Sequence, residues 1–213
     1  TQIRSSAASD VYKRQHYAGA TAATANDQFF RALMLEKWQP SARTVAPYFD
    51  HPEYIDALAK SVERAYAAAE KRPDVLVCSY HGVPRRYLLE GDPYHCQCQK
   101  TTRLLKERLG WQDTEIRTTF QSKFGPEEWL KPYTVEEVAR LAEEEGKKNI
   151  AVIAPAFSAD CIETLEEINE EIKESFEEAG GEGFLYIPCL NDDPEHVSAL
   201  CTVIDENLHG WAG

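Results

Sequence analysis

The chain has 213 residues, a formal net charge of −13, 43% hydrophobic residues and 28% charged residues. This length fits one domain or two small ones, and the excess of acid argues against nucleic-acid binding, which needs concentrated Lys and Arg. No apolar run approaches the ~20 residues of a membrane span, and no signal peptide opens the chain. We therefore expect a cytoplasmic protein without a transmembrane segment, whose six cysteines are free thiols.

The first part of the chain is only weakly patterned. Residues 1–15 show neither helical nor strand periodicity, so we expect no regular structure there. Residues 24–38 place apolar side chains at helical spacing, and Thr24 or Asn26 is suited to cap that helix. A helix is therefore the first element that the sequence predicts.

Further along, the pattern becomes regular. Residues 43–45 predict a short strand that runs into a loop, and residues 52–70 predict a helix with Pro52 in its first turn. Strand-like apolar runs then alternate with helical stretches. The expected strands are 73–80, 115–125, 148–157 and 183–190, and the expected helices are 98–110, 134–146, 161–181 and 194–211. This alternation predicts an α/β fold, an open parallel sheet with helices on both faces.

Three of these strands end in residues with useful chemistry. The first strand ends at residues 79–81, which include Ser79 and His81; Gln121 and Ser122 lie toward the end of the second strand, and residues 155–160 lie at the end of the third. Ligands of open α/β sheets bind outside the carboxyl ends of the strands. We therefore expect these residues to share one cleft.

His81 has two interpretations. A neutral imidazole at the end of a buried strand can accept a proton or bind a metal ion. It can equally hydrogen-bond the backbone of the loop and close the strand. The residue on its own does not separate these two interpretations.

A second candidate metal site consists of His95, Cys96 and Cys98. Structural zinc and iron–sulfur sites usually pair their ligands as C-x-x-C with a second pair at a suitable distance, and the remaining cysteines here stand singly. The stretch also leads directly into the helix predicted for residues 98–110. We interpret it as the start of that helix and not as a metal site.

The stretch from Asp160 to Glu171 also has two interpretations. Asp160 and Glu163 have the spacing of a capping box, in which Glu163 would only close the start of a helix. Glu163, Glu167 and Glu170 or Glu171 are alternatively spaced to stack along one helix face, where like charges raise one another's pKa and suit the passage of protons or cations. Spacing alone slightly favours the capping box.

The stretch around Phe124 and Trp129 offers either packing residues or a flat apolar wall for a planar ligand. Neither GxGxxG nor GxxxxGK(S/T) occurs in the chain. The sequence therefore gives no support to nucleotide binding.

Taken together, these motifs resemble the ferrochelatase family, whose members insert ferrous iron into a porphyrin to complete haem. The similar stretches are SYHGVPRRYLLEGDPYHCQCQKTTRLL, TTFQSKFGPEEWLKPYT, IAPAFSADCIETLEEI and YIPCLNDDPEH, in the family's order, and the resemblance covers about residues 16–208. It implies two similar Rossmann-like halves with a porphyrin cleft between them and no nucleotide.

The resemblance also implies roles for individual residues. His81 is similar to the family's histidine that takes pyrrole protons and contacts the metal, and Glu163 is similar to the carboxylate that pairs with it. Asp160 and Glu167 are similar to acidic residues of a proton or metal relay. The implied porphyrin contacts are Gln121, Ser122, Trp129 and Phe157. Metallation removes two N–H protons while a dication arrives, which requires a base and a carboxylate close together.

Ferrous iron enters this scheme as a substrate, and no permanently bound cofactor is expected. Some members of the family hold a 2Fe–2S cluster with cysteines, some of them in a C-terminal extension. The chain ends without that extension, so no cluster is expected here.

The chain also departs from the family's pattern. The family begins with a further segment that is missing here, and residues 1–15 match nothing in it. We therefore expect a truncated chain with unmatched residues 1–15, a remnant of the first half in 16–70, and a complete second half in 71–213 whose last helix packs back on the first half.

The leading interpretation is a ferrochelatase for protoporphyrin IX, with activity in doubt because of the truncation. The alternatives are a non-catalytic porphyrin-binding fragment and a cobalt or nickel chelatase of the same fold. The choice between protoporphyrin and coproporphyrin stays open, as does the oligomeric state.

Overall fold

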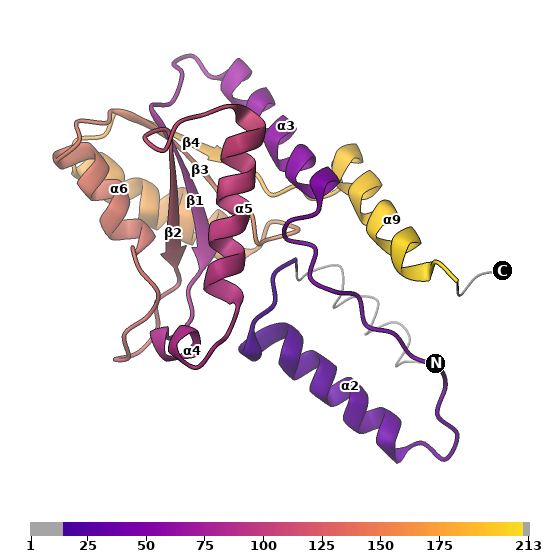
Figure 1. Cartoon of the computed structure of the whole chain (residues 1–213). Coiled ribbons are helices and arrows are strands. Elements are labelled where there is room, and N and C mark those ends of the chain that lie inside the picture. Colours follow the sequence, from indigo (N-terminus) through magenta and orange to yellow (C-terminus); the bar gives the residue numbers. More distant parts are fainter. Residues whose placement is uncertain (1–14, 211–213) are drawn as a thin grey trace.

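The fold is known from a computed structural model, which describes residues 15–210. Its centre is a single four-stranded sheet (Figure 1). The strands are β1 (Val75–His81), β2 (Ile116–Gln121), β3 (Asn149–Ile153) and β4 (Gly183–Ile187). Their order is β2-β1-β3-β4, and every neighbouring pair is parallel. The predicted α/β fold with a parallel sheet is confirmed.

Helices cover both faces of the sheet (Figure 1). One face packs against α3 (Pro52–Ala68), α5 (Tyr94–Leu109) and α9 (Pro194–Leu208). The other packs against α6 (Thr134–Glu143), the π-helical segment η2 (Glu167–Ile172) and α8 (Lys173–Glu178). Because side chains of a strand alternate between faces, Leu76, Cys78 and Tyr80 join the first core and Val77 joins the second. All six residues from Val75 to Tyr80 are buried, as expected for a strand covered on both sides.

The strand order creates a reversal point. From β1 the chain moves to one side of the sheet to form β2 and then returns to the other side to form β3. In open α/β sheets, ligands bind beside such a reversal point, outside the carboxyl ends of the strands. His81 is the last residue of β1, and the short helix α7 (Ile162–Leu165) follows β3.

Helix α3 follows the prediction closely. Pro52 occupies its first turn, where a missing N–H costs nothing. Its apolar side chains Ile55, Leu58 and Val62, spaced along one face, are buried. Its neighbour α5 ends at Gly110, which adopts a left-handed φ of 69° that glycine reaches without a steric penalty.

The N-terminal helix begins earlier than predicted. A π-helical segment, η1 (Gly19–Ala23), precedes α2 (Thr24–Leu35). The predicted cap at Thr24 or Asn26 is therefore wrong: the Thr24 hydroxyl donates to the Gly19 carbonyl (2.8 Å), one turn back inside the helical stretch. No residue of α2 is buried, and the helix lies apart from the sheet (Figure 1).

The strand predicted for residues 43–45 does not form. A strand needs a neighbour to pair with, and the four paired strands of the described chain all lie beyond residue 74. The segment is held by side chains instead: Val45 packs against the core, and the Arg43 guanidinium donates to the Asn207 carbonyl at the end of α9.

The predicted boundary near residue 15 meets a structured residue. Gln15 is fully buried, and its side-chain amide lies 2.7 Å from the Ser158 hydroxyl. The rest of the stretch predicted to be unmatched, residues 1–14, lies outside the described part of the chain. At the other end α9 packs against α3, where the Thr202 hydroxyl donates to Glu53 (2.7 Å).

The long helix predicted for residues 161–181 is divided into three parts. These are α7, then η2, then α8, with Glu166 between the first two. A π segment packs one more residue into a turn than an α-helix does, and such segments frequently occur at functional sites. Within residues 15–210, none of the helices combines the length and the apolar character that crossing a membrane requires.

Candidate functional site

The site is centred on His81, at the end of β1. Its Nδ1 lies 2.7 Å from the carbonyl oxygen of Gly82. A carbonyl oxygen only accepts, so Nδ1 carries the proton and donates. In the neutral imidazole Nε2 is then the unprotonated nitrogen, and it has no hydrogen-bond partner among the residues described here. The imidazole is half-buried and is held with one lone pair free to take a proton or a metal ion.

Glu163, in the first turn of α7, provides the matching carboxylate. Its pKa is lowered by a hydrogen bond with the Cys161 side chain, by a backbone N–H at the helix start and by nearby His81. Partial burial opposes this shift and is outweighed. The carboxylate is therefore ionised at neutral pH, and it lies close enough to His81 to interact with the protonated form of the imidazole.

The predicted capping box at Asp160 and Glu163 is wrong by one residue. The cap is Cys161, whose side chain accepts from the Thr164 backbone, while the Cys161 N–H donates to the Thr164 hydroxyl (3.0 Å). Glu163 therefore does not close the helix. Its carboxylate is available for chemistry, which the spacing alone did not favour.

Asp160 lies at the centre of a hydrogen-bond network that joins the ends of β3 and β4. One oxygen accepts from the Tyr186 hydroxyl and the Cys189 N–H, and the other accepts from the Asn191 amide (2.7 Å). Partial burial acts to raise its pKa, but the hydrogen bonds from Tyr186, Asn191 and Cys189 outweigh it and the pKa is lowered. The relay role of Asp160 stays a prediction; the contacts show an anchor of the loop before α7.

Glu167, the first residue of η2, is tied to the end of β2. Its carboxylate accepts from the Gln121 amide (3.0 Å) and from both the N–H and the hydroxyl of Ser122. Ser122 has a positive φ of 61°, which turns its N–H toward the carboxylate. The row of acids predicted along one helix face stops here, because Glu170 and Glu171 are exposed.

Gln121 bridges the two halves of the site. It is the Cα partner of His81 in the sheet, and its Nε2 donates to the carbonyl of Glu163 (2.7 Å). Its side chain is almost completely buried. The side chain of Gln121 is therefore surrounded by protein atoms. Porphyrin contact by Gln121 and Ser122 stays a prediction.

Aromatic and apolar side chains border this polar centre. The Trp129 ring lies 6.5 Å from the His81 ring and packs against Gly82, where an added Cβ would stand 3.0 Å from Trp129 Cε3. The buried indole N–H of Trp129 has no acceptor in the described chain. Phe157 is half-buried against the second core. Three large apolar side chains near Ser122 and Glu163 in sequence are exposed: Phe124, Ile162 and Leu165.

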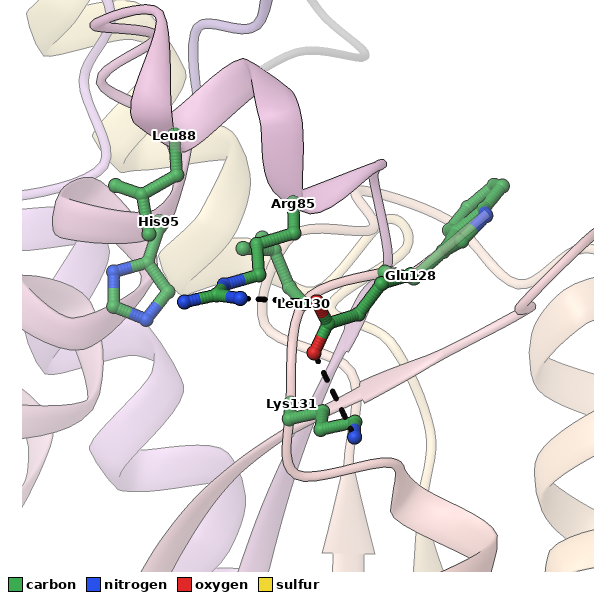
Figure 2. Close-up of a pocket in the computed structure, with 7 residues that line it drawn as sticks. Arg85, Leu88, His95, Glu128, Leu130 and Lys131 are labelled. Carbon is green, nitrogen blue, oxygen red and sulfur yellow. Dashed lines mark hydrogen bonds and ion pairs between the residues drawn. The ribbon is translucent and has the colours of Figure 1, made fainter. Parts of the chain in front are cut away.

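Trp129 also lines a groove of about 340 Å³, which Figure 2 shows with its lining side chains. Glu128 pairs there with Arg85 (2.9 Å) and Lys131 (3.7 Å). His95 contributes one wall and stacks on Phe120. Neither His81 nor Glu163 lines this groove, so we place the chemistry at the strand ends and not in the groove.

His95, Cys96 and Cys98 do not converge. They lie in the first two turns of α5, with Cys98 buried, Cys96 exposed and His95 half-buried. Among residues 15–210, no three His, Cys, Asp or Glu side chains are grouped as metal ligands.

Several residues of the site were not found from the sequence. The sequence places Ser79 at the end of the first strand, but its hydrogen bond to Gln121 depends on the fold. Cys161, Thr164, Tyr186 and Asn191 depend on contacts between separate loops, and no local pattern indicates them.

The family model described as ferrochelatase matches residues 11–208. Curated relatives of that name include those of Rhodobacter capsulatus (72% identical), Rhizobium meliloti (55%) and Mesorhizobium japonicum (50%). Each alignment spans 195 residues, which is 92% of this chain and 55%, 57% and 55% of the respective relatives. The chain thus spans about half the length of the curated relatives that it matches.

Proposed function

Since this chain belongs to the ferrochelatase family, we propose that it takes part in the insertion of ferrous iron into a porphyrin, with protoporphyrin IX as the preferred substrate. The observation that carries the proposal is the pairing of His81 and Glu163 at the reversal point of the sheet. One offers an unprotonated ring nitrogen and the other an ionised carboxylate. The exposed apolar residues Ile162 and Leu165 flank Glu163 in sequence and favour a planar apolar ligand.

The reaction exchanges two protons for one dication. A free porphyrin carries two pyrrole N–H groups, and both protons leave as Fe²⁺ binds the four nitrogens. We assign the first proton to Nε2 of His81, acting as a general base. The ionised carboxylate of Glu163 attracts the dication and then accepts the second proton. Glu167 and Asp160 line the path behind it, as the family resemblance implies.

The apolar part of the ligand has its own contacts in this scheme. We propose that Trp129 and Phe157 pack against the macrocycle, and that Gln121 and Ser122 border it through the strand end. The unpaired indole N–H of Trp129 supports this, because a ligand acceptor would satisfy it. Iron is then a substrate, and we propose no resident cofactor and no iron–sulfur cluster.

We propose the cytoplasm as the compartment. All six cysteines are free thiols, which is typical of a reducing environment.

The test is metal insertion by the purified chain, followed by the change of the porphyrin Soret band with Zn²⁺ or, without oxygen, Fe²⁺. His81→Ala should lower turnover by about 100-fold or more, because general bases contribute that much. Glu163→Gln keeps the size of the side chain and should lower turnover similarly. The matched controls are His209→Ala and Glu166→Gln, since both side chains are exposed.

Turnover that survives Glu163→Gln at the full rate would contradict the role of the carboxylate. Porphyrin binding without turnover, unaffected by His81→Ala, would instead identify a non-catalytic porphyrin-binding chain. A preference for Co²⁺ or Ni²⁺ over Fe²⁺ would identify a chelatase for another metal.

A further inference from the structure

A continuous row of buried polar side chains runs beneath His81, on the face of the sheet that α6 covers. The Thr134 hydroxyl lies 2.9 Å from the Thr119 hydroxyl and 2.8 Å from the Ser79 hydroxyl, and it must donate to Ser79 because the single Ser79 proton goes to Gln121. Ser79 donates to Oε1 of Gln121 (2.6 Å). Ser79, Thr119 and Thr134 are completely inaccessible to solvent, and Gln121 is 4% exposed. Polar groups buried so deeply are costly unless all of them are paired.

The row ends at the reactive carboxylates. Nε2 of Gln121 donates to the Glu163 carbonyl (2.7 Å) and to the Glu167 carboxylate (3.0 Å). Because both of these groups are acceptors, the NH₂ end of the Gln121 amide must face them, and Oε1 must point into the core. Ser79 supplies the donor that this buried oxygen needs. Without the Ser79 hydroxyl, Oε1 of Gln121 would be an unpaired acceptor in the core. An unpaired buried acceptor costs free energy, and a tilt of the amide would lower that cost.

Glu163 needs such an external support because its own helix is short. Helix α7 has only four residues, and the backbone changes to the π pattern at Glu167. Gln121 is the Cα partner of His81 and also holds the Glu163 backbone. One side chain therefore links the strand beside His81 to the backbone of Glu163.

We propose that Ser79 and Thr134 are positioning residues that act through Gln121 to hold Glu163 beside His81. The proposal rests on the function proposed above, because it assumes that His81 and Glu163 react. It gives Gln121 a second role, as a bridge, beyond the predicted contact with porphyrin. Neither hydroxyl touches the reacting atoms, so their loss should affect the geometry of the pair and not porphyrin affinity.

The experiment compares substitutions that remove one hydroxyl with little change of shape. Ser79→Ala and Thr134→Val should each lower kcat for zinc insertion about tenfold or more, since small misplacements of catalytic groups have large effects on rate. The KM for porphyrin should stay nearly unchanged. Thr134→Ser keeps the hydroxyl and should restore kcat. The matched control is Thr102→Val, which removes a buried hydroxyl bonded to Tyr80 (3.0 Å) on the opposite face of β1.

A fall in kcat no larger in Ser79→Ala than in Thr102→Val would overturn the proposal, as would a KM that rises in step with the fall in kcat.

If the parent chain inserts no metal, the proposed function fails for this chain, and NMR decides the positioning role separately. Ser79→Ala should then speed the hydrogen exchange of the Gln121 side-chain amide about tenfold or more and shift the backbone amide signals of residues 163–167. Thr102→Val should leave both unchanged. If Ser79→Ala also leaves both unchanged, the proposal is wrong.

Discussion

The acidic residues of the site differ in how many hydrogen bonds each carboxylate already accepts from the protein. Asp160 accepts at both oxygens, and so does Glu167. Glu163 has a thiol and a backbone N–H nearby and lies beside His81. A carboxylate whose two oxygens already accept hydrogen bonds from the protein is held in place by them. Within this group Glu163 is the carboxylate best suited to exchange protons or attract a cation.

His16 is a buried histidine whose burial should make the stability of the chain depend on pH. Its Nε2 pairs with the Thr101 hydroxyl (2.9 Å), and its ring lies among Phe49, Tyr80 and Tyr94. Burial lowers its pKa from 6.5 to about 3, and nearby Asp50 opposes the shift only weakly. Between these two values the unfolded chain binds a proton that the folded chain excludes.

The free energy of unfolding should therefore be highest above about pH 7 and fall as the pH drops from about 6.5 toward about 3. His16→Phe should flatten this part of the curve, although it loses the bond to Thr101 and should be less stable at pH 8. Urea unfolding at several pH values checks this. His209→Ala is the control and should keep the parent's slope, because that side chain is exposed. Equal slopes in the parent and in His16→Phe would contradict the prediction.

At the scale of elements, the site depends on how closely the end of β1 meets the loop before α6. The Gly82 N–H donates to the Gln121 carbonyl (2.8 Å), and Pro84 pairs with Trp129 in an isolated bridge. A Cβ on residue 82 would stand 2.9 Å from the Gln121 oxygen and 3.0 Å from the Trp129 ring. Glycine is needed here for the approach of two segments and not for an unusual φ.

Gly82→Ala should therefore push the Trp129 ring away from His81 and destabilise the chain by about 1–3 kcal/mol, the usual cost of overpacking. Thermal unfolding measures the stability, and tryptophan fluorescence, compared with that of the Trp129→Phe variant, reports the environment of the ring. A folded Gly82→Ala chain with unchanged fluorescence and stability would show that the contact is looser than described.

At the scale of the whole molecule, α2 stands out because it adds no buried residue to the core (Figure 1). Met34, Leu35 and Trp38 are 76%, 85% and 91% exposed, and they are close together in sequence. Grouped apolar side chains of this kind promote association, whereas single exposed ones are common on protein surfaces. The negative net charge of the chain opposes that association.

Leu35→Glu combined with Trp38→Glu should consequently reduce concentration-dependent association of the purified chain, and the effect should be largest at high salt, where charge repulsion is screened. Static light scattering over a range of concentrations is the measurement. Leu89→Glu is the matched control, because Leu89 is 73% exposed and belongs to a different helix, α4 (Arg85–Leu89). Association that responds equally to both changes would mean that α2 has no special part in it.

Local patterns were sufficient for much of this protein. The buried run at 73–80, the stripe of α3 and the alternation of strands and helices follow from side-chain periodicity, which depends only on neighbours in sequence. The same patterns placed His81 and the start of α7 at one edge of the sheet, because parallel strands end on the same side. The motifs around His81 and Glu163 then indicated the family.

Contacts between distant segments decided the rest. Residues 43–45 have the composition of a strand but no strand beside them, and the helix cap moved to Cys161 because Asp160 is held by Tyr186 and Asn191. Gln121 bonds to Glu163 and Glu167 because the ends of β2 and α7 meet in space. A hydrogen bond depends on which partner arrives within about 3 Å, and for these groups the partner is supplied by the fold and not by the adjoining sequence.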